Sequence, residues 1–448
     1  MSDLKLPQLF PLLGERVRVR AGVNSIWNSP GCISALRYWV TSLAIAALMT
    51  CGVGCASQGA HHQSLQGGEP RQWLGVAGNS PLGLTVYRPM NALSNAPLPV
   101  VFYLQNLAAP RAGTESDASI LRDFHDAGFL LVTVDFGGRT NARVPFINRD
   151  LARLREDVRA KKLLDDFNVD AAHIFIVPEG CQLKRDVVFY SDTNRVLAMD
   201  IIYPSQPKRP VGTVLEFSCD NKDRYGNFSL TFCSDTMMDA FATEGFAVAM
   251  ADHPVAPPYK GLDAMPGCAL KIKAAVRTLR VEGEKLGLNG KIVPVGFSRG
   301  SGMALMLVTT AGLAEFEDHG ENTGVSSDVQ GAVVMSGRFT YLDLLPDDKM
   351  VPRYNVAWGD RENHLDVWRK HGALDYLSGA AKVPLFLTIN CTESPDALHQ
   401  MEVLRRRLEA SASKFEFHMD NEPRGHKVTL VPEILSAMRD YLGRQLAH

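Results

Sequence analysis

The sequence has little net charge, and it lacks the motifs of several large classes of protein. Lys and Arg number 47 against 49 Asp and Glu, which gives a formal net charge of −2 at pH 7. A chain this balanced has no broad basic surface, so nucleic acid is not expected as a partner. The sequence contains no phosphate-cradling GxxxxGK[ST] motif, no dinucleotide-binding GxGxxG motif and no spaced set of metal ligands. We therefore expect no cofactor and no metal ion.

Long apolar runs are scarce, with one informative exception near the N-terminus. Residues 38–56 carry no charged side chain, and the segment before them is polar and basic. A run of this length suits the core of an export signal or a membrane span, with the basic end kept in the cytoplasm. Its end, Gly52-Val53-Gly54-Cys55-Ala56, resembles a bacterial lipoprotein cleavage site, which implies lipidation of Cys55. The alternatives are an uncleaved anchor helix, ordinary signal cleavage and a buried helix. We expect an exported protein of the cell envelope, held at a membrane by a lipid anchor or an N-terminal helix.

The rest of the chain has the composition of a globular protein, because 46% of all residues are hydrophobic and 21% are charged. We divide the sequence into a leader at 1–56, a flexible linker at 57–80 and two folded parts at 81–180 and 181–448. In both folded parts, strand patterns rich in β-branched and aromatic residues alternate with amphipathic helix patterns. This alternation predicts the α/β class, with a doubly wound and mostly parallel sheet.

The part at 81–180 repeats the first half of the part at 181–448. The segment LTVYRP near Val86 parallels MDIIYP near Ile201, and GFLLVTVD parallels GFAVAMAD. We interpret the first part as a degenerate half of an internal duplication. Its chemistry is expected to be absent, because Pro178-Glu179-Gly180 stands where the second copy has Gly296-Phe297-Ser298. The alternative is that any two stretches of alternating strands and helices look alike in sequence.

The segment Gly296-Phe297-Ser298-Arg299-Gly300 is a GxSxG pentapeptide. It follows the strand pattern KIVPV and precedes the small-residue helix pattern SGMALMLVTT, which is the strand–turn–helix context of a nucleophile elbow. A serine on so sharp a turn has a strained backbone, so the residues two positions away must lack bulk, as both glycines do. The start of the next helix also favours developing negative charge. We predict that Ser298 is a catalytic nucleophile; a loop serine in an inactive relative is the alternative.

With these residues in place, the chain from about Cys181 to its end resembles the α/β-hydrolase superfamily, particularly its esterase, feruloyl-esterase-like and dienelactone-hydrolase-like branches. The resemblance implies an acid after a late strand and a histidine near the C-terminus. It implies His426 as the base, because this residue lies between the last strand pattern and the final helix pattern. Glu393 and Asp396 both follow the strand pattern at 385–389, and the sequence leaves the choice of acid open.

The resemblance also implies an oxyanion hole and a substrate class. Arg299 would supply one backbone N–H, and Phe217 or Ser218 the other, in a loop that lacks the His-Gly-Gly sequence of lipase-like esterases. Polar residues of the loops after the strands suit a carbohydrate-like substrate, or else form salt bridges and turn caps: Asp220, Asn221, Arg224 and Asp252. We predict a serine hydrolase that cleaves a small-molecule or glycan ester. A prolyl-oligopeptidase-like peptidase and a non-catalytic binding protein on a hydrolase scaffold are the alternatives.

Overall fold

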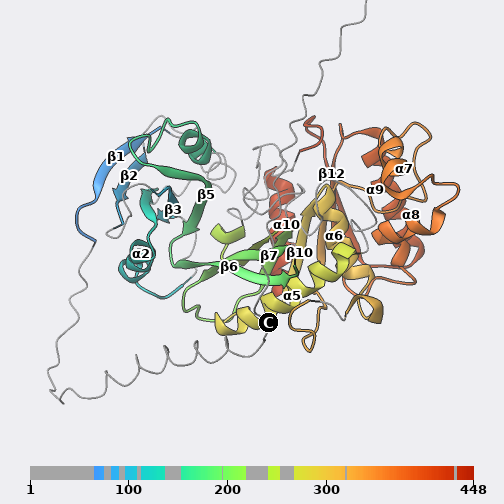
Figure 1. The fold of residues 1–448 in the computed structure, drawn as a ribbon, viewed down its shortest axis with the longest axis horizontal. Helices are drawn as coiled ribbons and strands as arrows, with labels where there is room; N and C mark the ends of the chain where they lie inside the picture. Colours follow the sequence, from blue (N-terminus) through green and yellow to red (C-terminus); the bar gives the residue numbers. More distant parts are fainter. Residues whose placement is uncertain are drawn as a thin grey trace, which may run out of the picture. The chain divides into compact units, whose positions relative to one another are not determined.

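The computed structural model of the chain describes residues 65–74, 82–89, 96–107, 113–136, 153–193, 195–217, 241–252, 267–317, 320–427 and 431–447. All of them belong to one compact unit, His62–His448, which contains two β-sheets and their helices (Figure 1). The α/β class is confirmed. None of the helices in these ranges is long and apolar enough to cross a membrane. The apolar run at 38–56, and Cys55 with it, lies outside the described residues.

The smaller sheet has five strands in the order β1-β2-β4-β3-β5. They are β1 (Glu69–Trp73), β2 (Leu82–Tyr87), β3 (Leu98–Gln105), β4 (Leu130–Asp135) and β5 (Val169–Pro178). Strand β2 is antiparallel to both β1 and β4, whereas β3 is parallel to both β4 and β5. Helix α2 (Asp117–Asp126) connects β3 to β4 and buries Ile120 and Phe124.

The structure corrects the prediction of a flexible linker at 57–80, because strand β1 lies inside that segment. The local sequence EPRQW has no β-branched residue, so nothing in its pattern predicts a strand. Tertiary contacts hold it instead. Trp73 is 7% exposed, and its indole Nε1 donates a hydrogen bond of 3.0 Å to Asp157. At the exposed end, Arg71 forms an ion pair of 2.6 Å with Asp166.

The larger sheet has eight strands in the order β13-β12-β11-β10-β8-β9-β7-β6. They are β6 (Cys181–Ser191), β7 (Val196–Pro204), β8 (Thr213–Phe217), β9 (Ala247–Ala251), β10 (Ile292–Phe297), β11 (Ala332–Met335), β12 (Leu385–Asn390) and β13 (Phe415–Asp420). Strands β8 to β13 pair with one another in parallel, and β7 is antiparallel to β6 and β9. The carboxyl ends of β10, β11 and β12 therefore meet at one edge, where ligands of parallel sheets bind.

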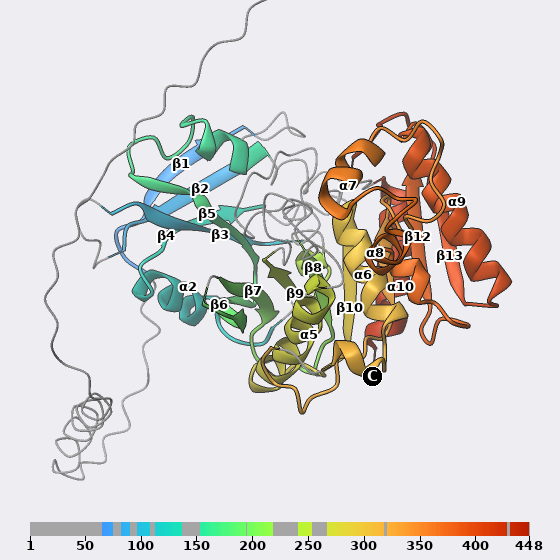
Figure 2. The same ribbon diagram turned by 45° about the vertical axis from the view of Figure 1, so that its right-hand side comes forward.

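Helices cover both faces of this sheet (Figure 2). The helices α5 (Gly267–Lys285), α6 (Arg299–Thr309) and α9 (Pro395–Ala410) share one hydrophobic cluster, and α10 (Pro432–Leu446) belongs to another. Along β12, Leu385 and Leu387 enter the first cluster and Phe386 enters the second. Successive side chains of a strand point to opposite faces, so a strand covered on both sides is apolar throughout.

Two short helices between β11 and β12 were not predicted from the sequence. They are α7 (Val351–Trp358) and α8 (Leu365–His371), drawn in orange in Figure 1. The turns η1 (Ala314–Phe316) and η2 (Ala373–Tyr376) complete the regular elements. Tyr354 and Trp358 of α7 and Trp368 of α8 form a separate small hydrophobic cluster.

The first five strands of the larger sheet have the same topology as the smaller sheet. In both, the order is first, second, fourth, third, fifth, with two antiparallel pairs followed by two parallel pairs. Val100 of β3 pairs with Leu130 and Ile174, as Thr213 of β8 pairs with Ala247 and Ile292. Ile174 therefore corresponds to Ile292 in register.

Candidate active site

The turn after β10 presents Ser298 at the carboxyl edge of the larger sheet. Ser298 has φ 54° and ψ −115°, a sparsely populated conformation for a residue with a Cβ, and it directly precedes α6. The turn is so tight that position 296 has no room for a side chain, since a Cβ at Gly296 would collide with the carbonyl oxygen of Gly300. The Ser298 N–H donates to the carbonyl of Met335 at 3.0 Å. The predicted strand–turn–helix context is present, and the positive end of the α6 dipole adjoins the serine.

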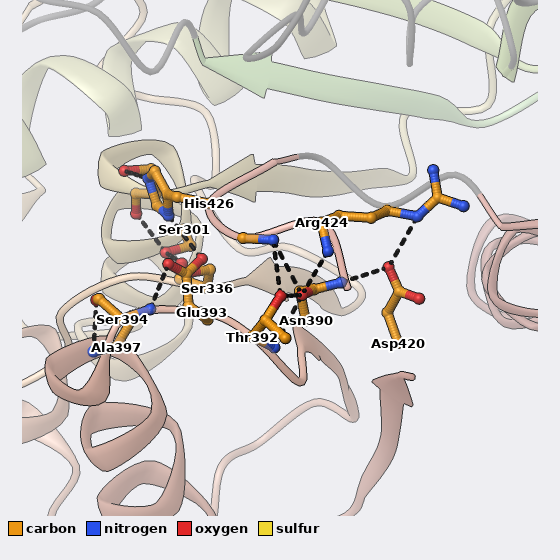
Figure 3. Close-up of polar contacts among 12 residues, drawn as sticks. Ser301, Ser336, Asn390, Thr392, Glu393, Ser394, Ala397, Asp420, Arg424 and His426 are labelled. Atoms are coloured by element: carbon orange, nitrogen blue, oxygen red, sulfur yellow. Dashed lines mark hydrogen bonds and ion pairs between the residues drawn. The ribbon is translucent and has the colours of Figure 1, made fainter. Parts of the chain in front are cut away.

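The structure brings Ser298, His426 and Glu393 together. His426 Nε2 lies 3.0 Å from Ser298 Oγ. His426 Nδ1 lies 2.6 Å from Glu393 Oε2 (Figure 3). The imidazole also packs on the ring of Phe297, with ring centroids 4.7 Å apart. A histidine that bonds a carboxylate through Nδ1 presents Nε2 to the serine as an acceptor.

Glu393 is held as a charged group. Its side chain is 2% exposed, and burial alone would raise its pKa. Hydrogen bonds outweigh that effect, so the pKa of Glu393 lies below its ordinary value: His426 and the Ser336 hydroxyl bond Oε2, and the Ser394 N–H bonds Oε1. A carboxylate ionised at neutral pH can stabilise an imidazolium beside it.

Asp396 is placed elsewhere, although it follows the same strand. Its carboxylate lies 3.3 Å from the guanidinium of Arg338, in the first turn of α9. Arg338 also forms a two-point ion pair with Asp348, which is buried. Asp396 thus belongs to an ion-pair network beside the pocket, and no hydrogen bond joins it to His426 among the described residues.

Asn390 links the loop of Glu393 to the loop of His426. It is the last residue of β12 and is 2% exposed. Its Oδ1 accepts hydrogen bonds from the backbone N–H groups of Thr392 and Arg424, at 2.9 and 3.2 Å (Figure 3). It also accepts from the Gly425 N–H at 3.2 Å. Its Nδ2 donates to Asp420 at 2.9 Å and to the carbonyl of Glu422 at 2.6 Å. One buried amide therefore ties together the two loops that carry the acid and the base.

A pocket of about 450 Å³ opens beside Ser298. Much of its wall is apolar or aromatic, and this part includes Met303, Tyr341, Met350, Tyr354, Trp358, His371, Ala373 and Ala397; Arg299 and Arg338 also line the pocket. The rings of Tyr354 and Trp358 are stacked at 4.5 Å, and Trp358 stacks on His371 at 4.0 Å. These rings brace one another, so α7 and α8 present a packed wall to the pocket.

The expected oxyanion groups are only partly within the described residues. Arg299 is the first residue of α6 and lines the pocket. Phe217 ends β8 beside the elbow, since a Cβ at Gly300 would lie 2.9 Å from the Phe217 carbonyl oxygen. Ser218 and the polar loop residues Asp220, Asn221 and Arg224 lie outside the described residues. Asp252 accepts a hydrogen bond of 2.7 Å from the Ala198 N–H, which is a structural contact between neighbouring strands.

Sequence reasoning did not identify Ser336, Asn390 or the aromatic wall as parts of the site. Ser336 and Asn390 share a signal that could have found them, because each is a polar residue at the carboxyl end of a buried strand. The described residues contain no group of three or more His, Cys, Asp and Glu side chains that could hold a metal ion.

Comparison with known proteins gives remote likenesses. No family model matches the sequence. No curated protein matches it either. Among solved structures, a truncated carbohydrate esterase from gut microbiota aligns with a TM-score of 0.49 and 16% identity, over 59% of this chain and 96% of that one. Esterase 2 of Thermogutta terrifontis with bound propionate aligns at 0.46 and 18%, over 60% and 96% of the two chains. Esterase B of Lactobacillus rhamnosis aligns at 0.47 and 16%, over 66% and 95%. These likenesses are too remote to carry an inference about activity.

Proposed function

We propose that the chain is a serine hydrolase that cleaves a carboxylic ester through an acyl-enzyme intermediate. The observation that supports it is the continuous hydrogen-bonded series from Ser298 Oγ through His426 to Glu393, at the edge of an apolar pocket. This order of hydroxyl, imidazole and buried carboxylate activates a serine for attack on a carbonyl carbon. We further infer an α/β-hydrolase fold, because the proposed nucleophile, acid and base follow β10, β12 and β13 in that order.

In the proposed first half-reaction, Ser298 Oγ attacks the ester carbonyl while His426 Nε2 takes the hydroxyl proton. The imidazolium is stabilised by the Glu393 carboxylate at 2.6 Å. Negative charge develops on the carbonyl oxygen next to the start of α6, where the Arg299 N–H and a group of the Phe217–Ser218 segment are proposed to stabilise it. The tetrahedral intermediate then expels the alcohol, which receives its proton from His426.

In the second half-reaction, water attacks the acyl group on Ser298 and gives a proton to His426. The new tetrahedral intermediate collapses, the carboxylic acid leaves, and the proton returns to Ser298 Oγ. The same imidazole acts once as base and once as acid in each half, so the reaction needs no other proton carrier.

The pocket suits an acyl group larger than acetyl. A volume of about 450 Å³ with an aromatic and thioether wall falls in the range that holds a medium-sized apolar group. We propose that the acyl side of the ester occupies this pocket and that the alcohol side, a carbohydrate in our preferred case, remains outside it. The envelope location and the lipid anchor at Cys55 are proposed from the sequence of residues 38–56 alone.

We also propose that the smaller sheet is a degenerate copy of the first half of the larger one. The shared strand order and register support it, and so does the backbone at the corresponding turn. Gly180 lies six residues beyond Ile174, as Ser298 lies six beyond Ile292, and both have positive φ, 75° and 54°. The two positions therefore share a positive φ, and a glycine stands in the smaller sheet where the larger one has the serine.

The test is hydrolysis of p-nitrophenyl acetate, butyrate and hexanoate by the full chain, together with labelling by a fluorophosphonate. We expect the parent to hydrolyse the longer esters better than acetate and to be labelled. Ser298→Ala and His426→Ala should each lower kcat by about a thousandfold or more, because the triad acts as a unit.

The matched control is Ser205→Ala, which removes a buried serine hydroxyl that bonds the Glu115 carboxylate away from the pocket. Its activity should equal that of the parent. Full activity or full labelling in Ser298→Ala would show that the nucleophile is another residue and would overturn the proposal.

A further inference from the structure

Ser336 is a buried polar residue at the carboxyl end of β11 whose polar groups are all engaged near the proposed triad. It is 2% exposed, and its φ of 49° lies in the left-handed region. Its N–H donates to the carbonyl of Thr388 at 3.1 Å, and its hydroxyl donates to Glu393 Oε2 at 2.9 Å. Its carbonyl lies 2.5 Å from the hydroxyl of Ser301 (Figure 3).

The nucleophile turn packs directly against this residue. The Ser301 hydroxyl is also 2.5 Å from the carbonyl of Ser298, so it sits between the nucleophile turn and the end of β11. A Cβ at Gly337, which follows Ser336, would lie 2.5 Å from that same Ser298 carbonyl oxygen. A left-handed residue with a side chain persists only where its surroundings fix it. Here the turn fixes Ser336 so that its hydroxyl points at the acid.

We propose that Ser336 is a positioning residue of the proposed hydrolase, and that its hydroxyl holds the Glu393 carboxylate in the orientation in which Oε2 bonds His426. The inference rests on the proposed function. Oε2 accepts from both His426 Nδ1 and Ser336 Oγ, while Oε1 accepts from the Ser394 N–H at 2.9 Å. Three donors on three elements fix a carboxylate more firmly than His426 alone. Ser336 acts through Glu393 and does not contact the reacting atoms.

The hydroxyl also shares the negative charge of Oε2. Without it, that oxygen would keep its full negative charge toward the imidazolium and attract it more strongly. The other charged groups lining the pocket are Arg299 on α6 and Arg338 after β11, and Arg338 is paired with Asp396 of α9. These groups remain when Ser336 is replaced, so a change in the pH profile reports on the hydroxyl.

The experiment measures kcat, KM and the pH dependence of kcat/KM for Ser336→Ala and Ser336→Gly in the full chain, with p-nitrophenyl butyrate. Alanine retains the Cβ and its strain, whereas glycine tolerates the positive φ, so only the glycine variant relieves backbone strain but both variants lack the hydroxyl. We expect both to lower kcat about ten- to hundredfold with KM changed less than about twofold. We also expect the acid limb of the profile to move up by about half a pH unit in both.

Ser205→Ala is the matched control, since it also removes a buried hydroxyl bonded to a glutamate, and it should leave kcat and the acid limb unchanged. If both Ser336 variants keep the parental kcat and acid limb, the proposal is overturned. A loss of kcat that follows the melting temperature, with an unmoved limb, shows a structural role only and also overturns it. A parent that neither hydrolyses the ester nor reacts with fluorophosphonate would instead overturn the proposed function itself.

Discussion

Glu393 and Asp396 follow the same strand within three residues of each other, and single contacts separate their roles. The Glu393 side chain is buried against His426, whereas Asp396 is held by the guanidinium of Arg338. Either side chain can serve as the acid of a triad, so residue type alone does not decide which carboxylate reaches the imidazole. The choice depends on how the β12 loop turns, and Asn390 sets that turn through hydrogen bonds to residues more than thirty positions away.

The two carboxylates can be separated by neutral variants of the same shape. We expect Glu393→Gln to lower kcat by about a hundred- to ten-thousandfold, because an amide neither stabilises the imidazolium nor fixes its tautomer. Asp396→Asn should keep kcat within about threefold of the parent, because a partly exposed ion pair contributes little and Asp348 still holds Arg338. Steady-state kinetics at pH 8 with p-nitrophenyl butyrate measures both. A larger loss in Asp396→Asn than in Glu393→Gln would assign the acid the other way.

At the scale of elements, the sequence predicted what local patterns determine and missed what tertiary contacts determine. The strand patterns KIVPV and 385–389 correspond to β10 (Ile292–Phe297) and β12 (Leu385–Asn390), because apolar runs between turn residues are local signals. The helices α7 and α8 have eight and seven residues, too few for a clear period. They pack against each other and form part of the pocket wall. The aromatic wall was therefore invisible in sequence, although it contributes much of the pocket's surface.

That wall contains a histidine that should make the fold sensitive to acid. Burial lowers the pKa of His371 to about 4, and its ring stacks on Trp358. In the unfolded chain this histidine binds a proton below about pH 6.5, its ordinary pKa, whereas in the folded chain it does so only near pH 4. The contribution of this neutral ring to stability is therefore complete above pH 6.5 and is lost as the pH falls from 6.5 to 4. The pKa difference corresponds to about 3 kcal/mol at most.

The prediction is tested by melting temperatures of the parent and of His371→Phe at pH 7 and pH 4.5. Phenylalanine keeps a ring on Trp358 but does not titrate, and a packing difference that is the same at both pH values cancels in the comparison. We expect acidification to lower the melting temperature of the parent by about 5 °C more than that of the variant. Equal decreases in the two proteins would show that His371 does not link stability to pH.

At the scale of the whole molecule, the copy proposed in the smaller sheet ends before the strands that carry most residues of the proposed active site. In the larger sheet, Ser336, Glu393 and His426 follow β11, β12 and β13. The smaller sheet has counterparts only of β6 to β10. After Gly180 the chain enters β6 at once, so the turn there is followed by a strand instead of a helix. The Gly180 N–H donates to the hydroxyl of Tyr103 at 2.7 Å.

The catalytic chemistry should therefore reside in one sheet, and a serine alone should not restore it in the other. We expect a fluorophosphonate to label the parent once per chain, on the tryptic peptide of Ser298, and to leave Ser298→Ala unlabelled. The double variant Ser298→Ala/Gly180→Ser should also stay unlabelled, because a hydroxyl on this turn meets Tyr103. The described histidines of the smaller sheet, His125 and His173, hydrogen-bond Arg88 and Asp170 instead. Intact-protein mass and peptide mapping measure both results, and circular dichroism checks that the double variant is folded. A label at position 180 would mean that the smaller sheet supplies its own base, and the chain would then have to be treated as two active hydrolase halves.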